Sequence, residues 1–132
     1  MKKLIYPAVL TALDNGEYVI KVPDVSGCVT TGDSLDDALD SIRDALCGCL
    51  CVLEDEGIPL PAPSAPADVS EEGSTVVLVD VDLIRYREET DTRSVRKNVS
   101  MPAWMATLAD RHNLNCSQLL QKAIRKELQL NR

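Results

Sequence analysis

The chain has 132 residues, of which 45% are hydrophobic and 27% are charged, and its formal net charge is −7. This composition is typical of a folded globular protein and excludes a wholly disordered chain. The apolar runs are far shorter than the roughly 20 residues that a membrane span needs, and 3% aromatic residues supply few stacking surfaces for single-stranded nucleic acid. We therefore expect a cytoplasmic protein without a membrane segment.

The charge is divided unevenly along the chain. Residues 1–82 contain 4 Lys and Arg against 16 Asp and Glu, a balance of −12, whereas residues 83–132 contain 10 against 5, a balance of +5. A basic segment is typical of phosphate binding, and an acidic body suits a basic protein partner or simply keeps the chain soluble. The two parts are therefore expected to meet different partners.

Three short β-strands are predicted first. Residues 3–13 and 18–22 favour strands and flank a turn signal at residues 14–17, which together indicate a hairpin. Residues 28–31 follow a second break and predict a third strand. Three antiparallel strands should then lead into a helix.

That helix should begin after Ser34, a good N-cap residue, and end before Gly57. Its leucines and Ile42 recur at helical spacing, so this stripe should pack on the sheet. On the same helical wheel, Cys47 and Cys51 fall on the opposite, polar face, where we expect them exposed and without a redox role.

The five cysteines are not expected to form disulfides or to bind metal. They are odd in number and lack a paired CxxC spacing, which fits reduced thiols in the cytosol. Cys47, Cys49 and Cys51 could join His112 only if they converged, but alternate helical residues diverge by about 200°. We expect no cofactor and no resident metal.

Residues 58–68 are rich in proline and should form an extended loop. Residues 74–82 predict a fourth strand, whose nearly continuous apolar character favours a position inside the sheet rather than at an edge. The first domain is thus a β-β-β-α-β unit over residues 1–84. Residues 85–92 are polar and predict a linker. A second domain then occupies residues 93–132, which makes the fold class α+β.

The second domain is predicted to contain a strand and two helices. Residues 94–102 indicate a strand that ends at Pro102, the expected first helical residue, and the first helix should end near Asn113. Asn115 should cap a second helix over residues 116–130. A unit of about 40 residues with so many apolar positions cannot be stable alone, so a second copy should complete it.

Alternation along the strand separates two sets of side chains. If two copies pair antiparallel, Arg96, Asn98 and Ser100 project from one face, whereas Lys97 and Val99 project from the other with Met101. Arginine and asparagine suit bidentate contacts to guanine and adenine, and a two-stranded ribbon fits the major groove of DNA. The pattern predicts a DNA-reading face, although a simple dimerisation hairpin stays open.

This segment resembles the ribbon-helix-helix family over about 40 residues. The resemblance implies that Arg96, Asn98 and Ser100 read bases in the groove of double-stranded operator DNA. It also implies that the start of the second helix holds a phosphate, through the backbone at Asn115, Cys116 and Ser117. Lys97 stands where the family has a hydrophobic residue. Its stem could cover the dimer core while its ammonium group contacts a phosphate.

The first domain also resembles a known family. Blocks along residues 4–82 occur in the order found in HicB-type antitoxins, namely residues 6–9, 14–18, 23–28, 31–35 and 58–64. The resemblance implies a truncated ribonuclease-H-like domain that inhibits a HicA-type toxin, a small basic ribonuclease, joined to a DNA-binding tail that represses the operon. The protein would not be an enzyme, and it would be a homodimer through its C-terminal domain, with further assembly into tetramers left open.

Two other functions stay open at this point. A metal-dependent nuclease would need several carboxylates around magnesium; Asp80 and Asp82 share a strand face, and Asp24 or Asp33 could approach them. Alternatively, the chain is a free-standing ribbon-helix-helix repressor whose first domain senses a small ligand. The residues that contact the toxin are not predicted by the sequence.

Overall fold

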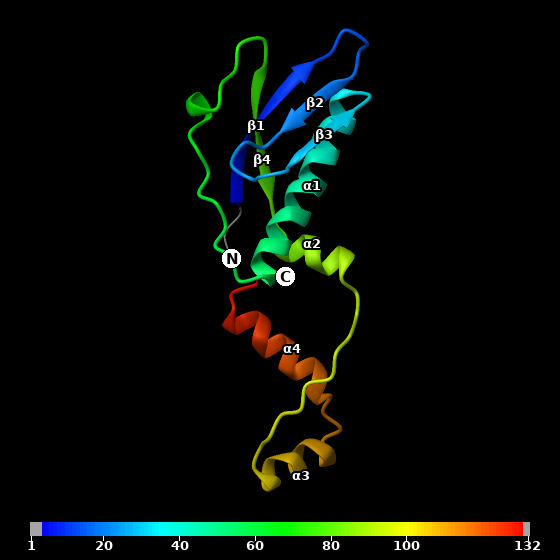
Figure 1. Cartoon of the computed structure of the whole chain (residues 1–132). Coiled ribbons are helices and arrows are strands. Elements are labelled where there is room, and N and C mark those ends of the chain that lie inside the picture. Colours follow the sequence, from blue (N-terminus) through cyan, green and yellow to red (C-terminus); the bar gives the residue numbers. More distant parts are fainter. Residues whose placement is uncertain (1–3, 131–132) are drawn as a thin grey trace. The chain divides into compact units, whose positions relative to one another are not determined.

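The computed structural model describes residues 4–130 of the chain. The chain divides into two compact units, and the boundary along the sequence lies between Thr92 and Arg93. The fold is α+β, as predicted, and Figure 1 shows a sheet with helices in the first unit and helices alone in the described part of the second. Within the described residues, no helix is both long and apolar enough to cross a membrane.

The first unit is built on a four-stranded antiparallel sheet. Its strands are β1 (Leu4–Ala12), β2 (Tyr18–Lys21), β3 (Val29–Gly32) and β4 (Thr75–Val81), in the order β3-β2-β1-β4. The predicted hairpin and third strand are confirmed, because β1 pairs with β2 and β2 with β3. Gly16 has a positive φ of 88°, which lets the chain turn sharply between β1 and β2.

Strand β4 lies at the edge of the sheet and not inside it, so that part of the prediction was wrong. It pairs with β1 alone among the described strands. Val79 and Val81 are buried on the face toward the helix, whereas Leu78 on the other face is 61% exposed. A nearly continuous apolar run therefore does not require two neighbouring strands, because Val77, Val79 and Val81 share the face toward the helix while Leu78 on the other face stays exposed.

Helix α1 (Leu35–Asp55) covers one face of the sheet, as predicted. Ser34 is its N-cap, with its side chain accepting a hydrogen bond from the Asp37 backbone N–H. Ala38, Ile42, Leu46 and Leu50 are fully buried. These aliphatic side chains form the centre of the core with residues from β1, β2 and β4.

The proline-rich segment is an ordered connection that includes a single 3-10 turn, η1 (Pro66–Asp68). Side chains from the sheet region hold it. The Tyr6 hydroxyl donates to the Pro61 carbonyl at 2.6 Å, and Asp24 accepts from the Ser64 backbone N–H at 2.8 Å. These hydrogen bonds fix the path of a segment that, apart from η1, forms neither a helix nor a strand.

The predicted linker over residues 85–92 is instead mostly helical. Helix α2 (Leu83–Thr90) is capped by Asp82, whose side chain accepts from the Arg85 backbone N–H. It packs against α1 with Leu83 buried. The linker prediction therefore needs correction, since the apolar Leu83, the amphipathic Tyr86 and the stem of Arg87 give this stretch one side that can pack.

The expected exposure of two cysteines was also wrong. Cys47 and Cys51 are buried, with 5% and 7% of their surfaces exposed. They lie on the face of α1 that turns toward α2, and Tyr86 belongs to the shell around the same core. A helical wheel drawn for α1 alone could not reveal this covering element.

The second unit contains α3 (Ala103–Arg111) and α4 (Cys116–Glu127). Asn115 caps α4 as predicted, with its side chain accepting from the Gln118 backbone N–H. Pro102 is the N-cap of α3 rather than its first residue, and α4 ends three residues before the predicted Leu130. Residues 91–102 form no regular structure in the single chain. A strand needs a hydrogen-bonding partner, and the predicted partner is a second copy.

Candidate interaction surfaces

A hollow of about 600 Å³ lies on the first unit between α1, β4 and α2. We call it the acidic hollow. Most of its polar lining is negatively charged, with five carboxylates against two guanidinium groups. The lining residues are Asp40, Arg43, Asp44, Cys47, Asp80, Asp82, Arg85, Tyr86 and Glu89.

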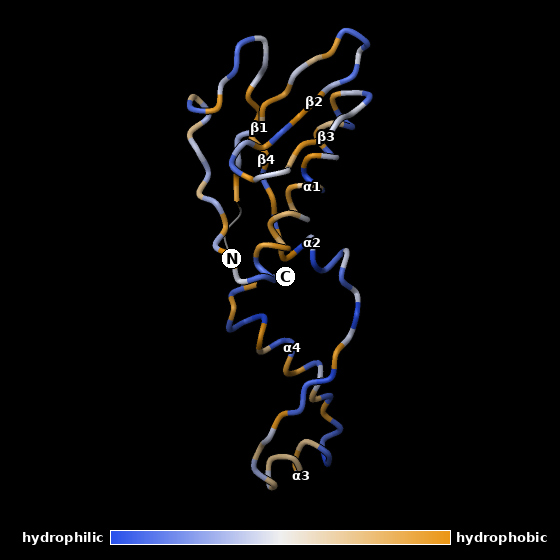
Figure 2. The backbone as a smooth tube through the Cα atoms, viewed as in Figure 1, coloured by the Kyte–Doolittle hydropathy of each residue, from blue (hydrophilic) through white to orange (hydrophobic). Residues whose placement is uncertain are grey.

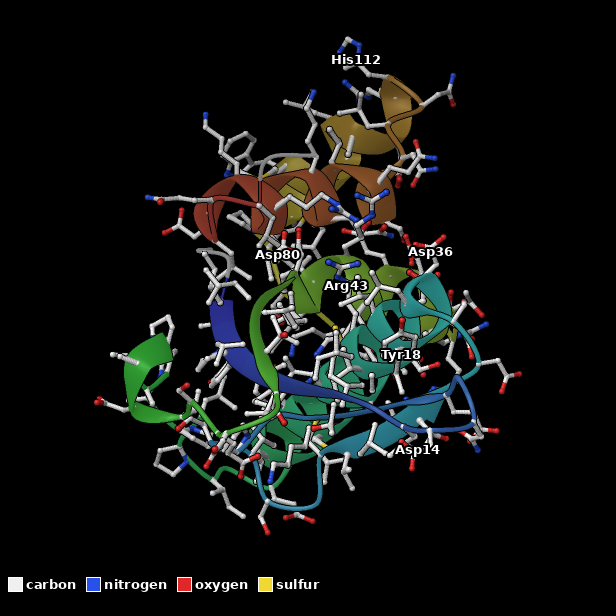
Figure 3. All side chains as sticks on the ribbon, turned by 90° about the horizontal axis from the view of Figure 1, so that it is seen from above. Asp14, Tyr18, Asp36, Arg43, Asp80 and His112 are labelled. Atoms are coloured by element: carbon white, nitrogen blue, oxygen red, sulfur yellow. The ribbon has the colours of Figure 1, made fainter. Side chains whose placement is uncertain are left out.

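Ion pairs organise the walls of the acidic hollow. Arg43 of α1 reaches β4, where its Nε donates to the Asp80 carbonyl and its NH2 group donates to the Asp80 carboxylate, both at 3.1 Å. Figure 3 labels both residues. On α2, Arg85 pairs with Glu89 at 3.2 Å. The pairs are roughly half exposed or more, so they shape the surface more than they stabilise the fold.

Of the four carboxylates considered for a metal-dependent nuclease, Asp80 and Asp82 line the hollow, whereas Asp24 and Asp33 do not. Among the described residues, no group of three His, Cys, Asp or Glu side chains could hold a metal ion. Asp24 is instead bonded to Ser64, at a different part of the unit. Burial raises the pKa of the Cys47 thiol to about 11, with Cys51 and Asp44 adding to the rise, so this group is not a thiolate near neutral pH.

The predicted base-reading residues lie on the irregular segment before α3. Arg96, Asn98 and Ser100 are exposed, and so is Lys97. The apolar residues that should alternate with them are exposed as well, with Val95 at 85% and Val99 at 55%. In the single chain, neither face of this segment is covered.

The predicted phosphate-binding residues lie together at the start of α4. Asn115, Cys116 and Ser117 are exposed, and Asn115 is engaged in capping the helix through its side chain. The backbone N–H groups of a helix's first turn carry partial positive charge, so this end suits an anion. The sequence placed these three residues correctly at a helix start.

Apolar side chains of the second unit are widely exposed. Figure 2 shows apolar positions recurring between polar ones along α4. Trp104 is 63% exposed, Leu119 49% and Ile124 43%, whereas Ala109 is buried. Two helices of this size cannot enclose their own apolar faces.

The amino-acid pattern did not predict the residues that join α2 to α1. Arg87 contacts the C-terminal turn of α1, and the Tyr86 hydroxyl lies near Gly48, where an added Cβ would stand 3.5 Å from it. The helix cap at Asp82 and the spacing of residues 83, 86 and 87 would have indicated a short one-sided helix.

Comparison with known proteins decides the family. Residues 6–124 match the family model described as the HicB-like antitoxin of the bacterial toxin-antitoxin system. The chain belongs to this family. The match spans both units, and the chain is therefore a HicB-type antitoxin, as its sequence blocks had suggested.

Individual relatives agree with this membership. The chain is 28% identical over 133 aligned positions to the antitoxin HicB of Escherichia coli strain K12, covering 95% of this chain and 96% of that one. It resembles the N-terminal domain of the Burkholderia pseudomallei antitoxin HicB with a TM-score of 0.55 and 27% identity, over 61% of this chain and 100% of that one. A chain of the HicA3 and HicB3 toxin-antitoxin complex is 26% identical, with a TM-score of 0.50, over 60% of this HicB-type chain and 99% of that chain.

Proposed function

We propose that this HicB-type antitoxin binds and inhibits a HicA-type ribonuclease toxin through its first unit, and represses its own operon through its second. The observation that carries the first half is the likeness to a chain solved within a HicA3 and HicB3 complex. The proposed partners are the toxin protein, double-stranded operator DNA and a second copy of the chain.

The distribution of charge supports this division of roles. Counted by structural unit, residues 2–92 contain 6 Lys and Arg against 19 Asp and Glu, a balance of −13. Residues 93–132 contain 8 against 2, a balance of +6. A basic toxin would be attracted to the first unit and repelled by the second, whereas DNA would be attracted to the second alone.

Toxin binding is tested by dividing the chain after Thr92. The truncated chain 1–92 retains α2 and so keeps the whole of the first unit. We expect it to co-purify with the toxin encoded beside it and to restore growth to cells that express that toxin. A truncated chain that is folded, yet neither binds nor protects, would contradict the proposal. Binding of a small ligand with no protein partner would favour a free-standing repressor.

DNA reading is supported by the alternation of residues before α3. In a paired ribbon, Arg96, Asn98 and Ser100 would face the bases, while Val99 would enter the dimer core. The exposed apolar residues around this segment and along α4 support a second copy as the covering partner. The amides at the start of α4, with Lys97, would hold the phosphate backbone.

Three variants of the full chain test this register. Arg96→Ala and Asn98→Ala should each cost about 1 to 3 kcal/mol of discrimination between the DNA upstream of its own gene and random DNA. Asn98→Ala should leave random-DNA affinity almost unchanged, because it removes no charge. Val99→Ala should lower both affinities together through a weaker dimer. If instead Val99→Ala alone removed discrimination, the assigned faces would be exchanged.

A further inference from the structure

We propose that α2 is a detachable clasp, which can leave α1 while the sheet and α1 stay folded, and which thereby lengthens the tether between the two units. The inference concerns the first unit itself and does not depend on the identity of the toxin or the DNA. It begins with the contacts that hold α2 in place.

One side chain makes most of the polar contacts between α2 and α1. The NH2 group of Arg87 donates to the Glu54 carboxylate at 3.1 Å, to the Asp55 carboxylate at 3.1 Å and to the Cys51 carbonyl at 3.3 Å. All three acceptors lie in the last turns of α1, which has no basic residue in its own last turn. Arg87 therefore supplies from α2 the positive charge that stabilises the C-terminus of a helix.

The remaining attachment of α2 is apolar, through the buried Leu83 and the partly buried Tyr86. Of its eight residues, one, Leu83, is buried, whereas α1 buries six. The Glu54 side chain is 32% exposed to solvent and the Asp55 side chain 67%. Salt can therefore screen both of their ion pairs with Arg87. The free energy that holds α2 is thus small compared with that of the sheet and α1, and segments of this kind open separately from the rest of a protein.

Release of α2 would change the reach of the second unit. With α2 docked, the irregular tether begins at Asp91, and with α2 released it begins at Leu83. Eight helical residues span about 12 Å, whereas eight extended residues span at most about 27 Å. Release also removes Arg85, Tyr86 and Glu89 from the wall of the acidic hollow. A partner that occupied the hollow would therefore favour the docked state.

Buried cysteines report whether α2 is docked. Cys47 and Cys51 lie on the side of α1 toward α2, whereas Cys28 is buried in the core beside Cys49. The experiment treats the full chain with N-ethylmaleimide and follows each cysteine by mass spectrometry of fragmented peptides. Arg87→Gln should accelerate labelling of Cys47 and Cys51 roughly tenfold, because three contacts of the clasp are lost, while Cys28 should keep its slow rate.

The control is Arg85→Gln, which removes the same charge from α2 but breaks only a pair within that helix. It should leave all three rates unchanged. Electrostatics cannot imitate the expected result: Arg87 lowers the pKa of Cys51 against the larger effect of burial, so its loss would make this thiol less reactive. Faster labelling therefore measures exposure.

Two outcomes would overturn the clasp. One is a common labelling rate for Cys28, Cys47 and Cys51 in the unchanged chain and in Arg87→Gln, which would show that only global unfolding exposes them. If labelling of Cys28 is also faster in Arg87→Gln, that variant unfolds as a whole and a second experiment is needed. The unchanged chain is then labelled at low salt and at about 1 M sodium chloride, which screens the ion pairs of Arg87. Acceleration confined to Cys47 and Cys51 would support the clasp, and its absence would refute it.

Discussion

Gly32 lies at the end of β3, where the backbone passes the first turns of α1. A Cβ added there would stand 2.6 Å from the Ala38 Cα and 2.9 Å from its Cβ. The backbone of α1 cannot move aside, because Ala38, Ile42 and Leu46 on its inner face are fully buried. Gly32 is therefore required by the close approach of two elements and not by an unusual φ.

Gly32→Ala should destabilise the first unit by about 3 kcal/mol, because strand and helix would have to separate. Gly48→Ala is the matched control. Its Cβ would meet only the Tyr86 hydroxyl, at 3.5 Å, and alanine favours a helix over glycine by up to about 1 kcal/mol. Urea unfolding followed by circular dichroism measures both. Equal midpoints for the two variants would show that the β3–α1 contact is not tight.

Helix α1 shows how local signals define an element. Ser34 accepts from the Asp37 backbone N–H, and the Asp37 carboxylate accepts in return from the Asp33 backbone N–H. Asp36 and Asp37 also place negative charge at the positive end of the helix. These contacts lie within five residues of the chain, which is why the helix start could be predicted.

Ser34→Ala should lower the free energy of unfolding by about 1 kcal/mol, through loss of the side-chain cap. Ser34→Asp should keep most of the stability, because aspartate also accepts from this backbone N–H and suits the helix dipole. Urea midpoints at neutral pH compare the two variants with the unchanged chain. An equal loss for both would mean that the Ser34 hydroxyl has a role other than capping.

At the scale of the whole molecule, the second unit leaves apolar side chains exposed in the single chain. Leu119 and Ile124 are nearly half exposed, although they lie on the apolar side of α4. The irregular segment before α3 likewise has no strand partner among the described residues. A second copy would supply both, since two copies can pair their strands and bury their apolar helix faces together.

Leu119→Asp or Ile124→Asp should prevent dimerisation, because each would place an unpaired charge in the shared core at a cost of about 3 kcal/mol or more. Gln121→Asp adds the same charge to a polar position of α4 and should have little effect. Sedimentation measures the oligomer, and DNA affinity should fall with it for the first two variants. An unchanged oligomer in both would refute the proposed dimer through the second unit.

The sequence by itself determined most of the order of elements. Turn residues, helix caps and apolar periodicity act over a few neighbouring residues, so they predicted β1, β2, β3, α1 and the cap of α4. The HicB-type family was also evident, because its blocks occur in order along the chain and the family model matches residues 6–124.

Only the tertiary structure decided what covers each surface. It placed β4 at the sheet edge, folded the expected linker into α2, and buried Cys47 and Cys51 beneath it. Burial depends on contacts between segments far apart in the chain: Arg87 meets Glu54 and Asp55 across more than 30 residues. A polar stretch of eight residues gains too little from its own hydrogen bonds to form a helix, so its structure depends on docking against α1.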